Sequence, residues 1–142
     1  MVTMRMRRYQ DLDVWKESID LALIAYNQTA SYPDSERYGL VSQTRRAAVS
    51  ISSNIAEGQG RSQPGEFLNA LSVARGSLQE LETLCILANR LGYTTSEQLE
   101  TLLTRADRIS RMLTGLRKSL ELDRRRRSRT SRQAYPPEEW EH

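Results

Sequence analysis

Residues 64–92 read PGEFLNALSVARGSLQELETLCILANRLG, and this stretch decides the fold class. Its large apolar side chains recur every three or four residues, which is the spacing of one face of an α-helix. Pro64 suits the first turn of that helix, and Gly92 suits the position just after its last turn. The pattern predicts a helix over about residues 66–91, with a core stripe of Phe67, Leu68, Leu71, Ala74, Leu78, Leu81, Cys85 and Ala88.

The same periodicity occurs in three other segments and predicts helices over about residues 11–31, 36–58 and 96–122. Before the last of these, residues 94–98 offer a capping box in two registers, Thr94 with Glu97 or Thr95 with Gln98. No segment shows the alternation of apolar and polar residues that is typical of a strand. Four long helices joined by short loops predict an all-α, up-down-up-down four-helix bundle.

The first two of the four helices carry more apolar surface than one bundle can hide. In the first helix, Val14, Leu21 and Ile24 lie off the main stripe, and a second apolar strip is often buried against another chain. We therefore expect these three residues to contact another subunit in a closed homo-oligomer. The main stripe of the first helix is Leu12, Trp15, Ile19, Ala22, Leu23, Tyr26 and Ala30. The second helix has a stripe of mostly small residues, Leu40, Thr44, Ala47, Ala48, Ile51 and Ile55.

A polar stripe also follows the second helix, and its spacing places all of its members on one side. Its members are Gln43, Arg46, Ser50, Asn54 and Glu57. One interpretation is a recognition surface. The interpretation that we favour is a structural network buried in the oligomer, because a buried charge must find a partner. In that network, Arg45 or Arg46 would pair with Glu57 or Glu82.

The composition argues against most enzyme chemistry. The single histidine is His142, the last residue, so Cys/His metal sites and a positioned histidine base are not expected. The single cysteine, Cys85, cannot form an intrachain disulfide and is typical of an inert core thiol in a reducing cytoplasm. The chain has no P-loop motif and no apolar run long enough to span a membrane. We expect a non-enzymatic, cytoplasmic protein without a cofactor, a metal ion or a small-molecule substrate.

Positive charge is concentrated near the two ends of the chain. Residues 1–123 contain 15 Lys and Arg against 15 Asp and Glu, whereas residues 124–142 contain 6 Arg against 3 Glu and so carry the net charge of +3. We expect a basic arm over residues 1–10, the bundle over residues 11–122, and a flexible, proline-containing tail over residues 123–142, because blocks of like charge repel. The candidate nucleic-acid-binding residues are Arg5, Arg7, Arg8, Arg124, Arg125, Arg126, Arg127, Arg129 and Arg132.

The arginine run allows two interpretations. It can attract the phosphates of a nucleic acid without any defined geometry, or it can be a solvated segment with no partner. No aromatic residue interrupts residues 124–132, so stacking on bases is not expected from the run itself. We favour an oligomeric module that binds RNA or single-stranded DNA through pooled basic segments. The alternative is a protein-interaction scaffold for a partner enzyme.

Six segments, in order along the chain, resemble one known family. They are DLDVW at residues 11–15, YGLVSQTRRAAVSI at 38–51, NIAEG at 54–58, GSLQELE at 76–82, LGY at 91–93 and MLTGL at 112–116. Over about residues 9–120 the chain resembles the four-helix-bundle proteins encoded in intervening sequences of bacterial 23S ribosomal RNA genes. More distantly, it is similar to the accessory proteins of diversity-generating retroelements. The first resemblance implies a ring-like homopentamer with no established enzyme activity, and the second implies binding to nucleic acid and to a reverse transcriptase.

Overall fold

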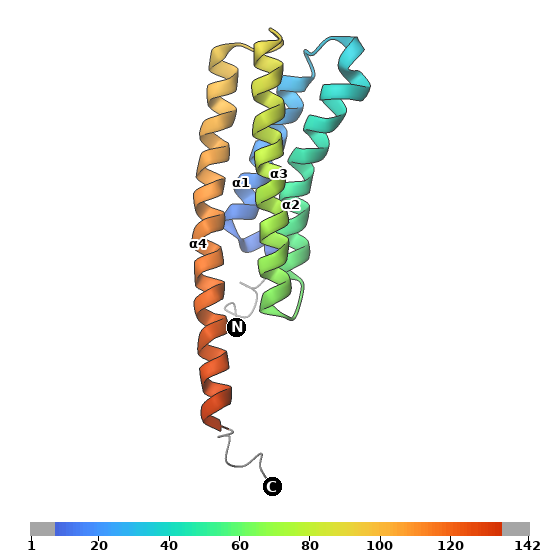
Figure 1. The fold of residues 1–142 in the computed structure, drawn as a ribbon. Helices are drawn as coiled ribbons and strands as arrows, with labels where there is room; N and C mark the ends of the chain where they lie inside the picture. The colour runs from blue at the N-terminus through green and yellow to red at the C-terminus, as the bar shows by residue number, and fades with distance from the viewer. Residues whose placement is uncertain (1–7, 135–142) are drawn as a thin grey trace.

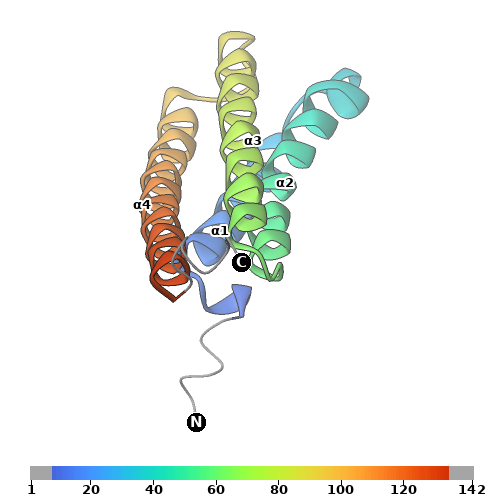
Figure 2. The same ribbon diagram turned by 60° about the horizontal axis from the view of Figure 1, so that its bottom comes forward.

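Four long helices run alternately up and down beside one another in the computed structural model (Figure 1). The structure describes residues 8–134, and no strand occurs within that range. α1 contacts α2 and α4, and α3 contacts the same two helices, so the four surround one core (Figure 2). The predicted all-α four-helix bundle is confirmed. The helices are α1 (Asp13–Thr29), α2 (Ser42–Gln59), α3 (Pro64–Arg90) and α4 (Ser96–Ala134).

Three short helical segments connect to these helices: η2 (Tyr9–Asp11) before α1, and η3 (Asp34–Glu36) and η4 (Arg37–Val41) before α2. η4 is a wide π-helical turn that contains a break at Gly39, where φ is −105° and ψ is −108°. Because of this break, α2 begins later than the sequence pattern predicts.

The core lies where the inward faces of the four helices meet. The predicted stripe of α2 is fully buried, and so is that of α3 apart from Phe67, which is half-buried. Burying a side chain the size of leucine contributes roughly 1.5–3 kcal/mol, so this core supplies most of the stabilisation. Its large, fully buried side chains are Leu21, Ile51, Ile55, Leu71, Leu78, Leu81, Leu102, Ile109 and Leu113.

The prediction for the inward face of α1 is wrong. Val14 and Leu21, expected to contact another subunit, are only 4% and 0% exposed in the single chain. Leu23, expected in the core, is 58% exposed. Ile24 packs, partly buried, against the core, and its contact with another subunit stays a prediction.

The buried face of α1 differs from the predicted apolar stripe because it includes polar residues whose hydroxyls donate to carbonyls of the same helix. The hydroxyl of Ser18 donates to the Val14 carbonyl at 2.7 Å, and that of Thr29 donates to the Ala25 carbonyl at 2.8 Å. A buried hydroxyl with such a bond avoids most of the cost of losing water. Apolar periodicity alone therefore misses this face.

The turn between α3 and α4 is closed by local hydrogen bonds. Gly92 has a φ of 87°, and the Gly92 and Tyr93 N–H groups donate to the Asn89 and Ala88 carbonyls, each at 2.9 Å. This pattern is a Schellman motif, in which glycine adopts the left-handed conformation at least cost. The capping box then forms in one of its two predicted registers, since Thr95 and Gln98 exchange hydrogen bonds of 2.9 and 3.1 Å.

α4 continues to Ala134, well past the predicted end at about residue 122, and projects beyond the other helices (Figure 1). Arginine is a good helix former, and positive charge is favourable near the C-terminal end of a helix. Asp123 also forms a 3.3 Å ion pair with Arg127 one turn later, in the favourable order for a helix. Helix propensity, the favourable position of the charges and this ion pair outweigh the repulsion between the arginines, from which a flexible tail is predicted. Residues 135–142 of that tail lie outside the described residues.

Candidate nucleic-acid interface

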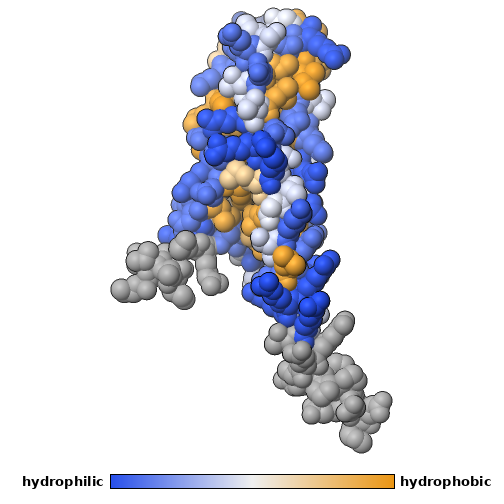
Figure 3. All heavy atoms as spheres, turned by 90° about the vertical axis from the view of Figure 1, so that its left-hand side faces the viewer, coloured by the Kyte–Doolittle hydropathy of each residue, from blue (hydrophilic) through white to orange (hydrophobic). Residues whose placement is uncertain are grey.

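The projecting end of α4 carries a run of exposed arginines. One helical turn holds about 3.6 residues, so the side chains of residues 124–127 leave the helix in all directions. In Figure 3 this end is a mostly hydrophilic surface. The exposed members are Arg124, Arg125, Arg126, Arg127 and Arg129.

The structure describes only some of the other predicted basic residues. Arg8 is exposed just before η2, at the end of the bundle from which α4 projects (Figure 2). Arg132 belongs to the last part of α4. Arg5 and Arg7 lie outside the described residues.

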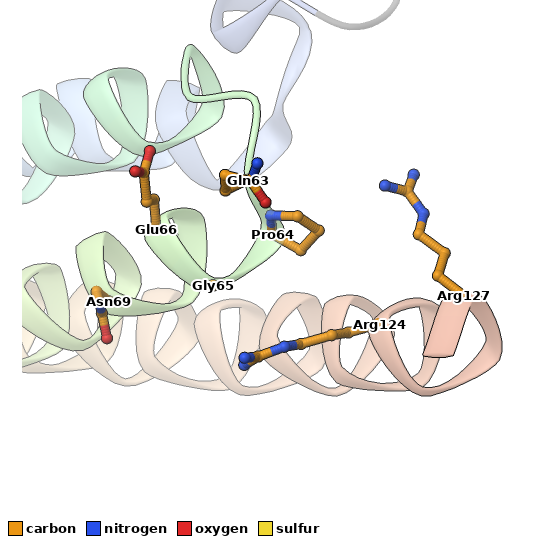
Figure 4. Close-up of a pocket in the computed structure, with 7 residues that line it drawn as sticks. All are labelled: Gln63, Pro64, Gly65, Glu66, Asn69, Arg124 and Arg127. Atoms are coloured by element: carbon orange, nitrogen blue, oxygen red, sulfur yellow. The ribbon is translucent and has the colours of Figure 1, made fainter. Parts of the chain in front are cut away.

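Arg124 and Arg127 line an open hollow of about 570 Å³ between α4 and the beginning of α3. Gln63, Glu66 and Asn69 line it from the α3 side. A Cβ atom at Gly65 would lie 3.7 Å from the guanidinium carbon of Arg124, which is an ordinary van der Waals distance, so Arg124 lies close to the beginning of α3. Figure 4 shows Arg124 extended along α4 and Arg127 rising from α4 on the side where Gln63 and Pro64 lie.

A second polar hollow, of about 330 Å³, lies between the end of α2 and the beginning of α3. It shares Glu66 and Asn69 with the first hollow, so the two adjoin. Asn54, Glu57 and Arg61 line its other side. The carboxylate of Glu57 forms a 3.3 Å ion pair with Arg61, and both side chains are largely exposed. Sequence reasoning missed Arg61, Glu66 and Asn69, because the hollow joins residues of two different helices.

The polar stripe is not a buried network within the single chain. Gln43, Arg46 and Glu57 are exposed in the single chain, so their predicted burial in an oligomer stays a prediction. Asn54 is half-buried and donates to the Ser50 carbonyl at 2.7 Å. The charged members of the stripe therefore lie on the outer side of α2 in the single chain.

The expected pairing of arginine with glutamate does not occur within the described residues of the single chain, and a pairing between subunits stays a prediction. Arg45 donates to the Thr29 hydroxyl at 2.9 Å and to the Tyr26 carbonyl at 3.3 Å, and Glu57 pairs with Arg61 instead. The partners of Arg45 are on α1 because its long side chain reaches across the α1–α2 contact. Burial and the neighbouring Asp107 raise the pKa of Glu82, which lies half-buried on α3.

Cys85 is a buried core thiol. Burial, with a smaller contribution from Glu82, raises its pKa to about 12. A thiol that stays protonated is a poor nucleophile and a poor metal ligand. In residues 8–134, no three His, Cys, Asp or Glu side chains lie close enough together to hold a metal ion. Within the same residues, no helix combines the length and the apolar character that crossing a bilayer requires.

The family model described as 23S rRNA-intervening sequence protein matches residues 10–115, which is most of the chain. The chain belongs to this family. The predicted family membership is thereby confirmed. The matched region of this intervening-sequence protein contains α1, α2, α3 and the bundle part of α4, and it stops before the arginine run.

Among solved structures, this intervening-sequence protein is similar to a protein of unknown function from the S23 ribosomal protein family of Bacteroides thetaiotaomicron. The two are 25% identical, with a TM-score of 0.67, over 74% of this chain and 98% of the other. No curated protein matches the chain at a significant level.

Proposed function

We propose that this protein is a non-enzymatic module that binds RNA or single-stranded DNA, chiefly through the arginines of α4. The observation that carries the proposal is the set of exposed arginines on a helix end that projects from the bundle. Residues 1–123 have no net charge, so the attraction for phosphates is concentrated at this end.

We also propose that the chains assemble into a homo-oligomer, with a pentamer preferred because of the family resemblance. Large apolar side chains remain exposed on all four helices, which supports assembly. Five chains of net charge +3 would carry +15, and five linked weak sites gain affinity through effective concentration. The exposed aliphatic residues are Leu23 on α1, Val49 on α2, Val73 and Leu87 on α3, Leu91 just after α3, and Leu122 on α4.

A second candidate function is a scaffold for a partner enzyme such as a reverse transcriptase. Tyr38 in η4 favours it, because this residue is 88% exposed, and η4 lies at the end of the bundle opposite the projecting arginines (Figure 1). Exposed aromatic residues are typical anchors of protein interfaces.

The test compares affinity for a single-stranded RNA at several salt concentrations in two variants of equal charge. One variant replaces Arg124, Arg125, Arg126 and Arg127 with Gln. The control variant also replaces four arginines with Gln, all of them exposed elsewhere on the bundle: Arg37, Arg46, Arg75 and Arg90.

The α4 variant should bind more weakly and with a shallower salt dependence, by about 0.7 in slope for each lost phosphate contact with a single strand. The control variant should keep most of the affinity. Equal losses in the two variants would refute α4 as the interface. No binding by the unmodified chain at low salt would refute the nucleic-acid function and leave the scaffold.

A further inference from the structure

The two polar hollows at the end of the bundle differ in charge. On the α4 side, Arg124 and Arg127 provide positive charge, and on the α2 side Glu57 and Glu66 provide negative charge. Figure 4 shows the Glu66 carboxylate turned toward α2 and the Asn69 amide turned toward α4. A ligand that crosses from one hollow to the other therefore meets arginine first and carboxylate second.

We propose that the hollow between α2 and α3 holds one base of the nucleic acid and prefers a base that carries an exocyclic amino group. This inference rests on the nucleic-acid binding proposed above and identifies which kind of nucleotide the site selects. The phosphates lie along the arginines of α4, and the base turns into the second hollow.

The charges decide which part of a nucleotide enters the second hollow. Glu57 and Glu66 would repel a phosphate there, and the one arginine of the hollow, Arg61, is already paired with Glu57. A neutral base has no such conflict. A volume of about 330 Å³ is at the lower end of the roughly 300–1,000 Å³ that small-molecule sites occupy, which suits a single base.

The acceptors of this hollow belong to Asn54, Glu57 and Glu66. Its donors are the Arg61 guanidinium, which pairs with Glu57, and the Asn69 amide, which is turned toward α4 (Figure 4). The Asn54 amide nitrogen donates to the carbonyl and the hydroxyl oxygen of Ser50, at 2.7 and 3.0 Å. The amide oxygen of Asn54 is left to accept a hydrogen bond. One Glu57 oxygen pairs with Arg61, and the Glu66 side chain has no hydrogen bond or ion pair with the described residues. Acceptors of this kind match the amino group of cytosine, to which carboxylates bind in nucleic-acid complexes.

The inferred ligand is a single strand, because a base must leave its stack to enter the hollow, and single-stranded nucleic acids offer unstacked bases. Uracil and cytosine test the preference best, since they have the same size. Cytosine presents an amino donor where uracil presents a carbonyl acceptor, and that acceptor would face the carboxylates without a hydrogen bond.

The experiment measures the affinity of the full chain for oligocytidine and oligouridine of equal length, at one salt concentration and neutral pH. We expect oligocytidine to bind about tenfold more tightly, which corresponds to one well-made base contact. In the double variant Glu57→Gln and Glu66→Gln, the preference should fall below about twofold, because an amide can donate to uracil as well as accept from cytosine.

A matched control replaces Glu97 and Glu100 with Gln at the beginning of α4, at the other end of the bundle. Both double variants gain the same charge, but only the first should lose the preference. Equal affinity of the unmodified chain for the two oligonucleotides would overturn the base-selecting site while leaving nucleic-acid binding intact. Preference retained after Glu57→Gln and Glu66→Gln would also overturn it. Failure to bind either oligonucleotide would overturn the proposed function itself.

Discussion

The guanidinium carbon of Arg45 on α2 lies 4.5 Å from the centre of the Tyr26 ring on α1. The same side chain donates hydrogen bonds to the Thr29 hydroxyl and to the Tyr26 carbonyl. Arg45 therefore joins α1 to α2 by a cation–π contact and two hydrogen bonds at once. Its neighbour Arg46 is exposed and has no such contact within the described residues.

Replacing Arg45 with Ala should lower the free energy of unfolding by about 1–2 kcal/mol, because it removes a cation–π contact and hydrogen bonds from a charged group. Arg46→Ala, the matched control, should change it by less than about 0.5 kcal/mol, as is usual for surface substitutions. Urea denaturation of both variants measures the difference. A larger loss from Arg46→Ala would show that the assembly buries Arg46.

Gly58 lies where α2 approaches α3 closely. A Cβ atom there would lie 2.5 Å from the Ala70 Cβ and 2.9 Å from a ring carbon of Phe67. Gly58→Ala should therefore destabilise the protein by about 1–3 kcal/mol through overpacking.

Gly76→Ala is the control for Gly58→Ala and should have the opposite sign. A Cβ at Gly76 would meet nothing within 4 Å, and alanine is favoured over glycine inside a helix by up to about 1 kcal/mol. Thermal unfolding of both variants gives the comparison. Destabilisation by Gly76→Ala would mean that another chain packs against this position.

Two leucine substitutions test which face of α1 points into the core. Leu21→Ala should cost about 2–5 kcal/mol, because it leaves a cavity in the core. Leu23→Ala should cost little in the single chain, since the Leu23 side chain is mostly in water. The measurement is chemical denaturation at several protein concentrations. If Leu23→Ala costs as much as Leu21→Ala, and more so at high concentration, Leu23 lies in an interface between subunits.

Stability should fall in alkaline solution through Cys85. Burial raises the pKa of the folded thiol from its ordinary value of 9.0 to about 12, so above pH 9 the unfolded chain loses its proton while the folded chain keeps it. The unfolded state then binds fewer protons, and the free energy of unfolding decreases as pH rises from 9 toward 12. Burial also raises the pKa of Tyr32 to about 12, which acts in the same direction.

Denaturation midpoints measured across that pH range should decline less steeply in Cys85→Ala than in the unmodified chain. Both proteins are compared with their own values at pH 8, which cancels the cost of the missing side-chain atoms. An unchanged decline in Cys85→Ala would assign the alkaline loss to other groups.

The sequence predicts best those features whose signals are local. The cap at Thr95, the glycine that ends α3 and the stripe of α3 are encoded within a few residues of where they act. The inward face of α1 was mispredicted because a serine or threonine bonded to its own helix looks the same in sequence as an exposed one.

The candidate site depends on distant parts of the chain. Its hollows combine residues from the end of α2, the start of α3 and the extension of α4, and only the helix packing brings these together. The arginine run could be recognised from charge alone, but its helical form could not, because repulsion and helix propensity oppose one another at those residues.

The extension of α4 has consequences for motion as well as for charge. Every residue from 121 to 129 is exposed, so local bonds rather than core packing stabilise this part of the helix. Its backbone amides should therefore exchange with solvent deuterium much faster than those around Ile109 and Leu113, which open only with the whole bundle. A bound polyanion would neutralise the arginines and slow that exchange. Exchange rates of the extension would therefore show whether a polyanion is bound there, while the exchange rates of the rest of α4 stay unchanged.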